Sequence, residues 1–277
     1  MTPDIIHISS PQDPRLVRYQ REFERKSHMR DGCFVAESQF LVQRLLDSPF
    51  QVESILVDDE AKIPKLPSQR VGQFPIYVLS RSDIKELVGY NFHRGIMACG
   101  IRPERSTIGL VFPEAVPPTS TILAASKIGD YENMGAIIRA ACAFGADAIL
   151  LDDGCADPFA RRSLRVSTGH AFKIPIVESE DFTADLKTLV GLGFENFATV
   201  LSDAATPLAE VTRAPRSVLL VGNEGYGLEE DTLAQCTHQI TIPMQRGSDS
   251  LNVAMATGIF LYHFCHMPPG SPADDLA

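Results

Sequence analysis

The sequence predicts a two-domain α/β protein whose second domain contains a parallel β-sheet. Short apolar runs alternate with helical patterns, and those of the second half are uninterrupted, as in strands covered on both faces. A length of 277 residues with 44% hydrophobic residues is enough for two packed cores. Residues 103–118 contain four prolines and separate the halves. We therefore predict an N-terminal domain, a linker, a C-terminal domain and a disordered tail at residues 1–105, 106–118, 119–268 and 269–277.

The first half is predicted to form a small α/β unit. Residues 15–30 lack Gly and Pro, which favours a polar helix that ends at Asp31-Gly32. Ser82 is in position to cap a later helix. The other predicted elements are strands at 33–36, 52–57, 76–79 and 95–99 and helices at 38–46 and 82–88, with a loop at Pro64 and Pro67.

The second half alternates strands and helices more regularly. The predicted strands are 121–125, 147–151, 174–177, 196–201, 218–221 and 239–242, and the predicted helices are 133–144, 159–167, 182–190, 228–234 and 251–266. Ligands of such sheets bind beyond the carboxyl ends of the strands. Three segments of unusual composition lie near predicted strand ends, so we expect functional residues there.

The chain is acidic, but its charge is unevenly distributed. The net charge is −10, yet residues 1–118 contain 15 basic and 15 acidic residues, so the second half carries the whole excess. Between residues 15 and 30, six basic residues accompany two acidic ones. This stretch is either a local patch for nucleic acid or the solvated face of a helix. In the first case, the residues that we expect to bind RNA include Arg15, Arg18 and Arg25.

The cysteines and the apolar runs bear on metal binding and location. The six cysteines are widely spread and form no C-x-x-C pair, which favours free thiols in a reducing cytoplasm over disulfides or a zinc site. His263, Cys265 and His266 either bind a metal ion or mark a helix end before a Pro-rich tail, and we expect no metal. No apolar run approaches ~18 residues, and the first residues resemble no secretory signal. We expect a cytoplasmic protein without a membrane span.

A glycine-rich turn follows the predicted strand 218–221. Residues 221–228 read VGNEGYGL, and the glycines permit close backbone approach and positive φ. The spacing G-x-x-G-x-G differs from the dinucleotide fingerprint G-x-G-x-x-G. The turn either cradles a nucleotide or only connects a strand to a helix. Glu224 is likewise either a site residue or a carboxylate favoured by a helix dipole.

Two further segments stand at the starts of predicted helices. Residues 242–252 read IPMQRGSDSLN, in which Ser250 and Asn252 are local candidates for helix caps. Residues 133–139 read NMGAIIR, in which Asn133 is another candidate cap. Arg139 within this apolar run is unexpected unless it reaches a cleft, a phosphate or a local carboxylate.

In this order and spacing, the three segments resemble the signature of the SpoU (TrmH-like) family of RNA ribose 2′-O-methyltransferases, in the SPOUT superfamily. The resemblance implies S-adenosylmethionine as the cofactor. The implied cofactor-binding residues are Gly222, Asn223, Ile242, Met244 and Leu251. The implied catalytic residues are Arg139, Asn133, Glu224, Ser250 and Asn252. Two departures leave the loop length intact: Arg246 stands where the family often has glycine, and Asp249 where it usually has glutamate.

The resemblance also implies a fold and partners. It implies that the C-terminal part of the parallel sheet is threaded as a trefoil knot, and that the protein is a homodimer with the site near the subunit interface. Residues 253–264 are then either a dimer element or a core helix. The N-terminal half is similar to the family's small, L30e-like substrate-binding domain. Arg161 and Arg165 resemble a segment that holds substrate RNA, although an exposed basic helix would look the same.

The predicted function is therefore methyl transfer to a ribose 2′-hydroxyl of structured RNA. Because an arginine with a pKa above ~12 cannot accept the hydroxyl proton, we expect Arg139 to act as an electrostatic clamp. A separate substrate domain favours ribosomal RNA over transfer RNA. One alternative is a non-catalytic RNA-binding protein with this fold, against which the full catalytic set counts. Another is a small-molecule enzyme with a different nucleotide, against which the missing dinucleotide fingerprint counts.

Overall fold

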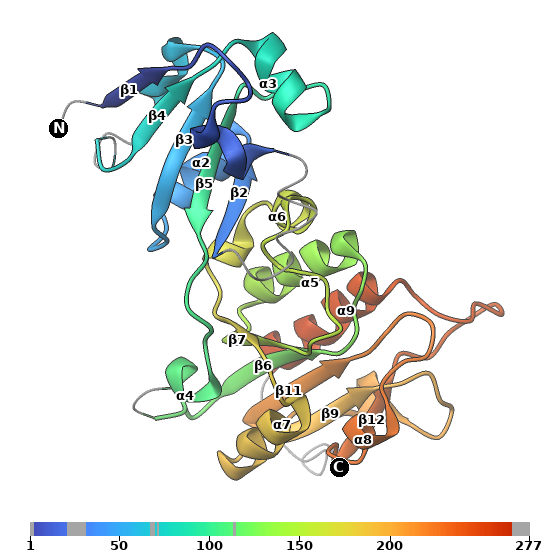
Figure 1. Ribbon diagram of the computed structural model, residues 1–277. Helices are drawn as coiled ribbons and strands as arrows, with labels where there is room; N and C mark the ends of the chain where they lie inside the picture. The colour runs from blue at the N-terminus through green and yellow to red at the C-terminus, as the bar shows by residue number, and fades with distance from the viewer. Residues whose placement is uncertain (1–2, 21–31, 67–69, 71, 113–114, 268–277) are drawn as a thin grey trace. The chain divides into compact units, whose positions relative to one another are not determined.

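The computed structural model describes residues 3–20, 32–66, 70, 72–112 and 115–267 (Figure 1). Two compact units are formed: unit 1 comprises Met1–Glu104 and Asp157–Lys173, and unit 2 comprises Arg105–Ala156 and Ile174–Ala277. The exchange of Asp157–Lys173 into unit 1 was not predicted from the sequence. Arg25, most of the predicted helix 15–30 and the predicted disordered tail 269–277 lie outside the described residues.

Unit 1 contains a five-stranded mixed sheet in the order β1-β4-β3-β5-β2. The strands β1, β4 and β3 run parallel, whereas β5 is antiparallel to both β3 and β2. The strands and α-helices are β1 (Asp4–His7), β2 (Cys33–Glu37), α2 (Gln39–Leu46), β3 (Val52–Val57), β4 (Pro75–Val78), α3 (Arg81–Val88), β5 (Ile96–Ile101) and α6 (Arg161–Val166). Short 3₁₀ segments lie at Pro14–Tyr19, Glu60–Lys65 and His170–Phe172. Apart from β1 and the 3₁₀ turns, these elements were predicted within two residues.

Local capping explains where the elements of unit 1 start. Ser38 Oγ accepts a hydrogen bond from the Leu41 amide at 3.3 Å and starts α2. Ser80, rather than the predicted Ser82, caps α3. The predicted helix from residue 15 is wrong at its start, because a 3₁₀ turn ends at Tyr19 and Gln20 is extended. Tyr19 is fully buried and its hydroxyl lies 2.8 Å from Ser54 Oγ, which fixes this turn on the sheet.

An aromatic cluster attaches Asp157–Lys173 to unit 1. The ring of Phe34 on β2 stacks on Phe159 and Phe172 at centroid distances of 5.3 and 5.5 Å, and Phe50 packs against the same two rings. These four rings bury a large apolar area. The segment is therefore part of the core of unit 1, although it follows strand β7 (Ala148–Leu151) of unit 2 in the chain.

Unit 2 is built on a seven-stranded sheet in the order β10-β12-β9-β11-β6-β7-β8. Every neighbouring pair is parallel, which confirms the predicted parallel sheet. The strands are β6 (Ser120–Ala125), β7 (Ala148–Leu151), β8 (Ile176–Glu178), β9 (Glu195–Thr199), β10 (Thr206–Pro207), β11 (Arg216–Val221) and β12 (His238–Thr241). The α-helices are α4 (Ile108–Val111), α5 (Tyr131–Phe144), α7 (Phe182–Gly191), α8 (Glu230–Leu233) and α9 (Val253–His266), with a 3₁₀ turn at Leu208–Glu210. Only β10, α4 and the 3₁₀ turn were not predicted.

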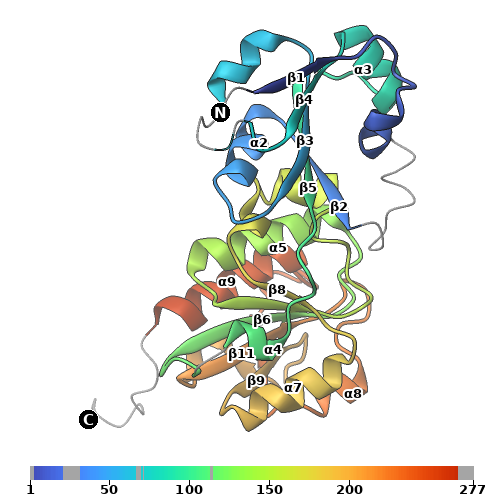
Figure 2. The same cartoon turned by 60° about the vertical axis from the view of Figure 1, so that its left-hand side comes forward.

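The helices of unit 2 cover both faces of its sheet. In both views, α5 and α9 lie together on one face, and α4, α7 and α8 lie on the other (Figures 1 and 2). The central strands β6 and β11 are buried almost throughout, as expected for a sheet covered on both sides. Phe264 of α9 is fully buried and packs edge-on against Phe197 of β9 at 4.8 Å. No helix of the described residues is long and apolar enough to cross a membrane.

Candidate functional site

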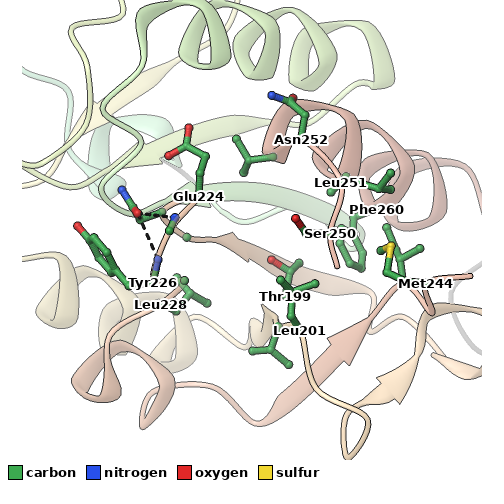
Figure 3. Close-up of a pocket in the computed structure, with 18 of the residues that line it drawn as sticks. Thr199, Leu201, Glu224, Tyr226, Leu228, Met244, Ser250, Leu251, Asn252 and Phe260 are labelled. Carbon is green, nitrogen blue, oxygen red and sulfur yellow. Dashed lines mark hydrogen bonds between the residues drawn. The ribbon is translucent and has the colours of Figure 1, made fainter. Parts of the chain in front are cut away.

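A cavity of about 580 Å³ lies in unit 2 at the carboxyl ends of β9, β11 and β12, which are neighbours in the sheet. Parallel sheets bind ligands at this edge. Its walls come from three separate segments (Figure 3). They are residues 199–201 at the end of β9, residues 222–228 and Leu233 after β11, and Ile242, Met244, 250–253, Ala256 and Phe260 after β12. Two of the three segments singled out in the sequence therefore meet around one cavity.

The glycine-rich loop after β11 is a tight backbone turn. Asn223 and Gly227 exchange two backbone hydrogen bonds of 3.1 and 2.9 Å. A Cβ atom on Gly222 would lie 2.4 Å from the carbonyl carbon of Gly227, so this position accepts only glycine without a backbone shift. Gly227 has a φ of +73°, which also favours glycine. Because these glycines have no side chains, a ligand in the cavity can approach the backbone of the loop closely.

The side chain of Asn223 ties this loop to the end of β6. Its Nδ2 donates to the carbonyl oxygen of Lys127 at 2.9 Å, and its Oδ1 accepts from the amide of Gly225 at 2.8 Å. Lys127 is held in turn by Asp152, whose carboxylate accepts from the Lys127 amide at 2.9 Å and from Ser126 Oγ at 2.6 Å. The predicted cofactor residue Asn223 therefore shapes the loop through both of its polar atoms.

A directional chain of hydrogen bonds joins the three sequence segments at the polar end of the cavity. Asn252 caps α9 by accepting from the amides of Ala254 and Met255, so its Nδ2 is the donor toward Asn133 Oδ1 at 2.9 Å. Asn133 Nδ2 then donates to Glu224 Oε1 at 2.6 Å. The amide orientations follow from this network. Three of the five predicted catalytic residues thus meet although up to 119 positions separate them.

The local capping predictions are resolved by the same contacts. Asn252 is the N-cap of α9, as its sequence position indicated. Asn133 is not a cap, because Asp130 accepts from the amides of Glu132 and Asn133 and starts α5 two residues earlier than predicted. This extra half-turn places Asn133 inside the helix, where its side chain is available to bridge Asn252 and Glu224. Ser250 lines the cavity and caps no helix.

The apolar wall of the cavity includes residues that the sequence did not single out. The predicted Ile242, Met244 and Leu251 line it, together with Leu228, Leu233 and Phe260. Thr199, Val200, Leu201 and the exposed Tyr226 were also missed. The end of predicted strand 196–201 was the available signal for residues 199–201. This signal did not identify residues 199–201 as cavity residues, because the sequence does not show which strand ends lie side by side in the sheet.

Of the five predicted catalytic residues, Arg139 is the one that neither lines the cavity nor joins the hydrogen-bonded chain. It lies on α5, six positions beyond Asn133, and it is exposed and absent from the cavity lining. Neither the predicted cleft nor a local carboxylate is therefore its partner among the described contacts.

Arg246 has a φ of +57°, which explains why glycine would suit this position.

The predicted RNA-binding arginines are distributed within unit 1. Arg15 pairs with Asp13 at 2.7 Å, and Arg18 lies 3.5 Å from Glu53. Arg161 and Arg165 line a second cavity together with Tyr90. Arg15 and Arg18 therefore lie in the 3₁₀ segment Pro14–Tyr19 and Arg161 and Arg165 on α6, and their RNA-binding role stays a prediction.

One group among the described residues brings three possible metal ligands close together. Ligand atoms of Cys33, Glu53 and Cys99 all lie within 4.8 Å of one another. A hydrogen bond from Cys99 lowers the pKa of the Cys33 thiol, whereas that hydrogen bond and burial raise the pKa of Cys99. His263, which the sequence grouped with Cys265 and His266, instead bonds to the carbonyl oxygen of Val211.

Comparison with known proteins identifies relatives that span nearly the whole chain. The model of the SpoU rRNA Methylase family matches residues 120–262. An uncharacterized tRNA/rRNA methyltransferase of Mycobacterium tuberculosis is 32% identical over 97% of this chain and 96% of its own length. The 23S rRNA (guanosine(2553)-2′-O)-methyltransferase RlmP of Bacillus subtilis is 30% identical over 92% and 98%. The crystal structure of an rRNA methyltransferase from Sinorhizobium meliloti superimposes with a TM-score of 0.79, at 26% identity, and covers 94% of this chain and 97% of that one.

Proposed function

The chain belongs to the SpoU rRNA methylase family and is an RNA methyltransferase that uses S-adenosylmethionine, and from this premise we propose that it methylates a ribose 2′-hydroxyl group of ribosomal RNA. The observation that carries the proposal is the hydrogen-bonded chain from Asn252 through Asn133 to Glu224 at the polar end of the cavity. The full-length match to a relative named as a 23S rRNA 2′-O-methyltransferase supports the substrate class.

The residues around the cavity fit S-adenosylmethionine. The cavity volume of about 580 Å³ is within the range of roughly 300–1,000 Å³ common for small-molecule sites. Apolar side chains of Ile242, Leu251 and Phe260 offer contact for an adenosine group, and the backbone of the glycine-rich loop offers hydrogen-bonding groups. When bound, the cofactor supplies a methyl group on a positively charged sulfur. We assign its binding to Gly222, Asn223, Ile242, Met244 and Leu251.

The chain's polar residues would align the ribose rather than donate the methyl group. A transfer of this kind depends on holding the attacking hydroxyl in line and assisting the loss of its proton. Asn133, which Asn252 holds in turn, fixes the Glu224 carboxylate at one oxygen, and Ser250 lines the same cavity as Glu224. We assign the orientation of the 2′-hydroxyl to Glu224 and Ser250, and the support of Glu224 to the two asparagines.

The exposed face of α9 supports a homodimer. Met255, Ile259 and Tyr262 follow one another at helical spacing and remain 61%, 44% and 56% exposed. The helix packs along α5, which carries the exposed Arg139. We propose that a second copy covers this face and that Arg139 then clamps the phosphate beside the reacting ribose. We further propose that the C-terminal part of unit 2 is knotted, as in the family, and that residues 1–105 bind the RNA.

The deciding experiment is methyl transfer from radiolabelled S-adenosylmethionine to size-fractionated RNA from a strain that lacks this gene. We expect label in large-subunit ribosomal RNA, located at a ribose by resistance of the adjacent bond to alkali. Arg139→Ala should reduce the rate by about 10²–10³-fold without abolishing cofactor binding. Label in transfer RNA alone, or on a base, would contradict the proposal.

The dimer has a separate test. Tyr262→Glu places a charge on the exposed face of α9, and we expect it to produce monomers in light scattering. Leu110→Glu, at a residue 66% exposed on α4, is the matched control and should leave the mass unchanged. A wild-type chain that is monomeric at micromolar concentration would refute the dimer.

A further inference from the structure

Two cysteines of unit 1 share one face of its sheet. Cys33 of β2 pairs with Ile101 of β5, whereas Cys99 of β5 pairs with Val35 of β2. Paired residues of antiparallel strands point to the same face, and so do residues two positions apart along a strand. Cys33 and Cys99 are therefore diagonal neighbours on this face, and the Cys99 thiol donates a hydrogen bond to Cys33.

A β-bulge brings a carboxylate to the same face. Val52 and Ser54 of β3 pair with consecutive residues of β5, so Glu53 between them is the extra residue of a bulge. A bulge aims its side chain away from the regular alternation of a strand. The Cys33 thiol donates to Glu53 Oε2 at 3.2 Å. The neighbouring strands β3, β5 and β2 thus contribute one candidate metal ligand each.

The spacing of these ligand atoms suits a bridging cation better than a disulfide. The Cα atoms of diagonal neighbours lie about 7–8 Å apart, beyond the roughly 4.4–6.8 Å that a disulfide spans. Around a tetrahedral zinc ion, Zn–S distances of about 2.3 Å and Zn–O distances of about 2.0–2.2 Å place the ligand atoms about 3.6–3.8 Å apart. The 3.2 Å between Cys33 Sγ and Glu53 Oε2, and the 4.8 Å within which all three ligand atoms lie, bracket this separation.

The surroundings of the three residues favour a cation. Cys99 is fully buried, whereas Cys33 is half-buried and the Glu53 side chain is 39% exposed, so a cation can enter from the solvent beside Glu53. Two thiolates and a carboxylate carry three negative charges, of which a divalent cation leaves one. Arg18 Nε lies 3.5 Å from Glu53 Oε1 and balances that charge. A loaded site would thus be close to neutral, which limits the cost of a partly buried ion.

We propose that Cys33, Cys99 and Glu53 bind a zinc ion that clamps β2, β5 and β3 of unit 1 together, with a water molecule as the fourth ligand. Both sulfurs ligate as thiolates, so two thiol protons pass to the solvent for each ion bound. Thiolates select Zn²⁺ over Mg²⁺ and Ca²⁺, which prefer oxygen ligands. The proposal replaces the expectation from the sequence that no metal binds, because the three residues lie far apart in the chain and form no C-x-x-C pair.

The test is a titration of the untagged, reduced full chain, freed of metal by a chelator, with Co²⁺ as an optical probe of the zinc site. We expect one Co²⁺ for each chain, a sulfur-to-cobalt charge-transfer band, the visible absorption of four-coordinate cobalt, and displacement of Co²⁺ by Zn²⁺. Zn²⁺ should also raise the melting temperature, because it binds only the folded site, and should protect Cys33 from iodoacetamide. Absence of one-to-one binding, or bound Co²⁺ without the charge-transfer band, overturns the proposal.

Two variants separate the ligands. Glu53→Gln keeps both sulfurs, so the charge-transfer band should remain, while the affinity for Zn²⁺ falls by more than the roughly 10–100-fold typical of lost outer partners. Cys33→Ser should lower the charge-transfer intensity for each bound ion and abolish the zinc-dependent rise in melting temperature. Both residues reach the surface, so the fold should persist, which the melting temperature without metal and retained S-adenosylhomocysteine binding would verify.

The matched control is Cys236→Ser, which removes a half-buried thiol of unit 2 that donates to the carbonyl oxygen of Thr232. It should bind Co²⁺ and Zn²⁺ like the wild type. An equal loss in this control, or wild-type zinc affinity in Cys33→Ser, overturns the proposal. So does a Cys33–Cys99 disulfide that forms with peroxide in a protein that binds no zinc, because the two thiols would then be a redox pair. None of these measurements uses RNA, so their outcome is independent of the proposed function.

Discussion

Substituting alanine for Gly222 should cripple cofactor binding, and the structure gives the size of the effect. The added Cβ would lie 2.4 Å from the carbonyl carbon and 2.6 Å from the carbonyl oxygen of Gly227, whereas ordinary contacts are 3.4–4 Å. The backbone at Gly227 must therefore move by about 1 Å, which breaks its two hydrogen bonds with Asn223. At about 0.5–1.5 kcal/mol for each bond, loop order loses about 1–3 kcal/mol.

This loss should be measured as the affinity for S-adenosylhomocysteine by isothermal titration calorimetry. Because the variant must recover this loop order when it binds the ligand, its dissociation constant should rise roughly five- to 150-fold. Gly225→Ala is the matched control, because its Cβ would meet only Asn223 Oδ1 at 3.4 Å, and we expect a change within about twofold. Wild-type affinity in Gly222→Ala, with the cofactor still in this cavity, would refute the reasoning. Equal losses in both variants would show that any side chain in the loop is harmful.

Three other predictions concern single side chains. Asn133→Ala should lower the turnover rate by roughly 10²-fold and change the affinity for S-adenosylhomocysteine little, because Asn133 supports Glu224 but does not line the cavity. An unchanged rate in single-turnover assays would contradict this prediction. Arg246→Gly should raise the free energy of unfolding by ~1 kcal/mol, because Arg246 is held at a φ of +57°; a decrease in urea unfolding would argue against strain there. At pH 8, iodoacetamide should label Cys33 before Cys236. A hydrogen bond from Cys99 lowers the pKa of Cys33, whereas burial raises the pKa of Cys236 to about 11. Peptide mass spectrometry that found Cys236 labelled first would count against this order.

The fold was largely predictable because its elements follow local rules. Uninterrupted apolar runs located six of the seven strands of unit 2 within two residues, and glycine at position 145, with a φ of +83°, ended α5 where expected. The two-residue strand β10 was missed because its residues, Thr206 and Pro207, carry no strand pattern. The packing of Asp157–Lys173 into unit 1 depends on contacts of Phe34 with Phe159 and Phe172, which no local pattern reveals.

The site was predictable only as three separate segments. Asn133, Glu224 and Asn252 were singled out by their segments, but their contact requires β6 to lie beside β11, only β9 to separate β11 from β12, and Asp130 to cap α5. Neither condition can be derived from periodicity, because strand order is a property of the whole chain. The same limit explains Arg139. A position in the apolar run of α5 indicated a specific partner, and the structure instead leaves the side chain exposed.

The exposure of Arg139 and the packing of α9 along α5 bear on each other. In the role proposed for it, Arg139 acts from outside the cavity lining of its own chain, and an exposed apolar face made of Met255, Ile259 and Tyr262 is unfavourable in a monomer. A second copy placed over α9 would bury that face beside the helix that carries Arg139. The two features therefore have one explanation if the active form is a dimer. In that case Tyr262→Glu should lower activity in proportion to the loss of dimer, and high protein concentration should restore it.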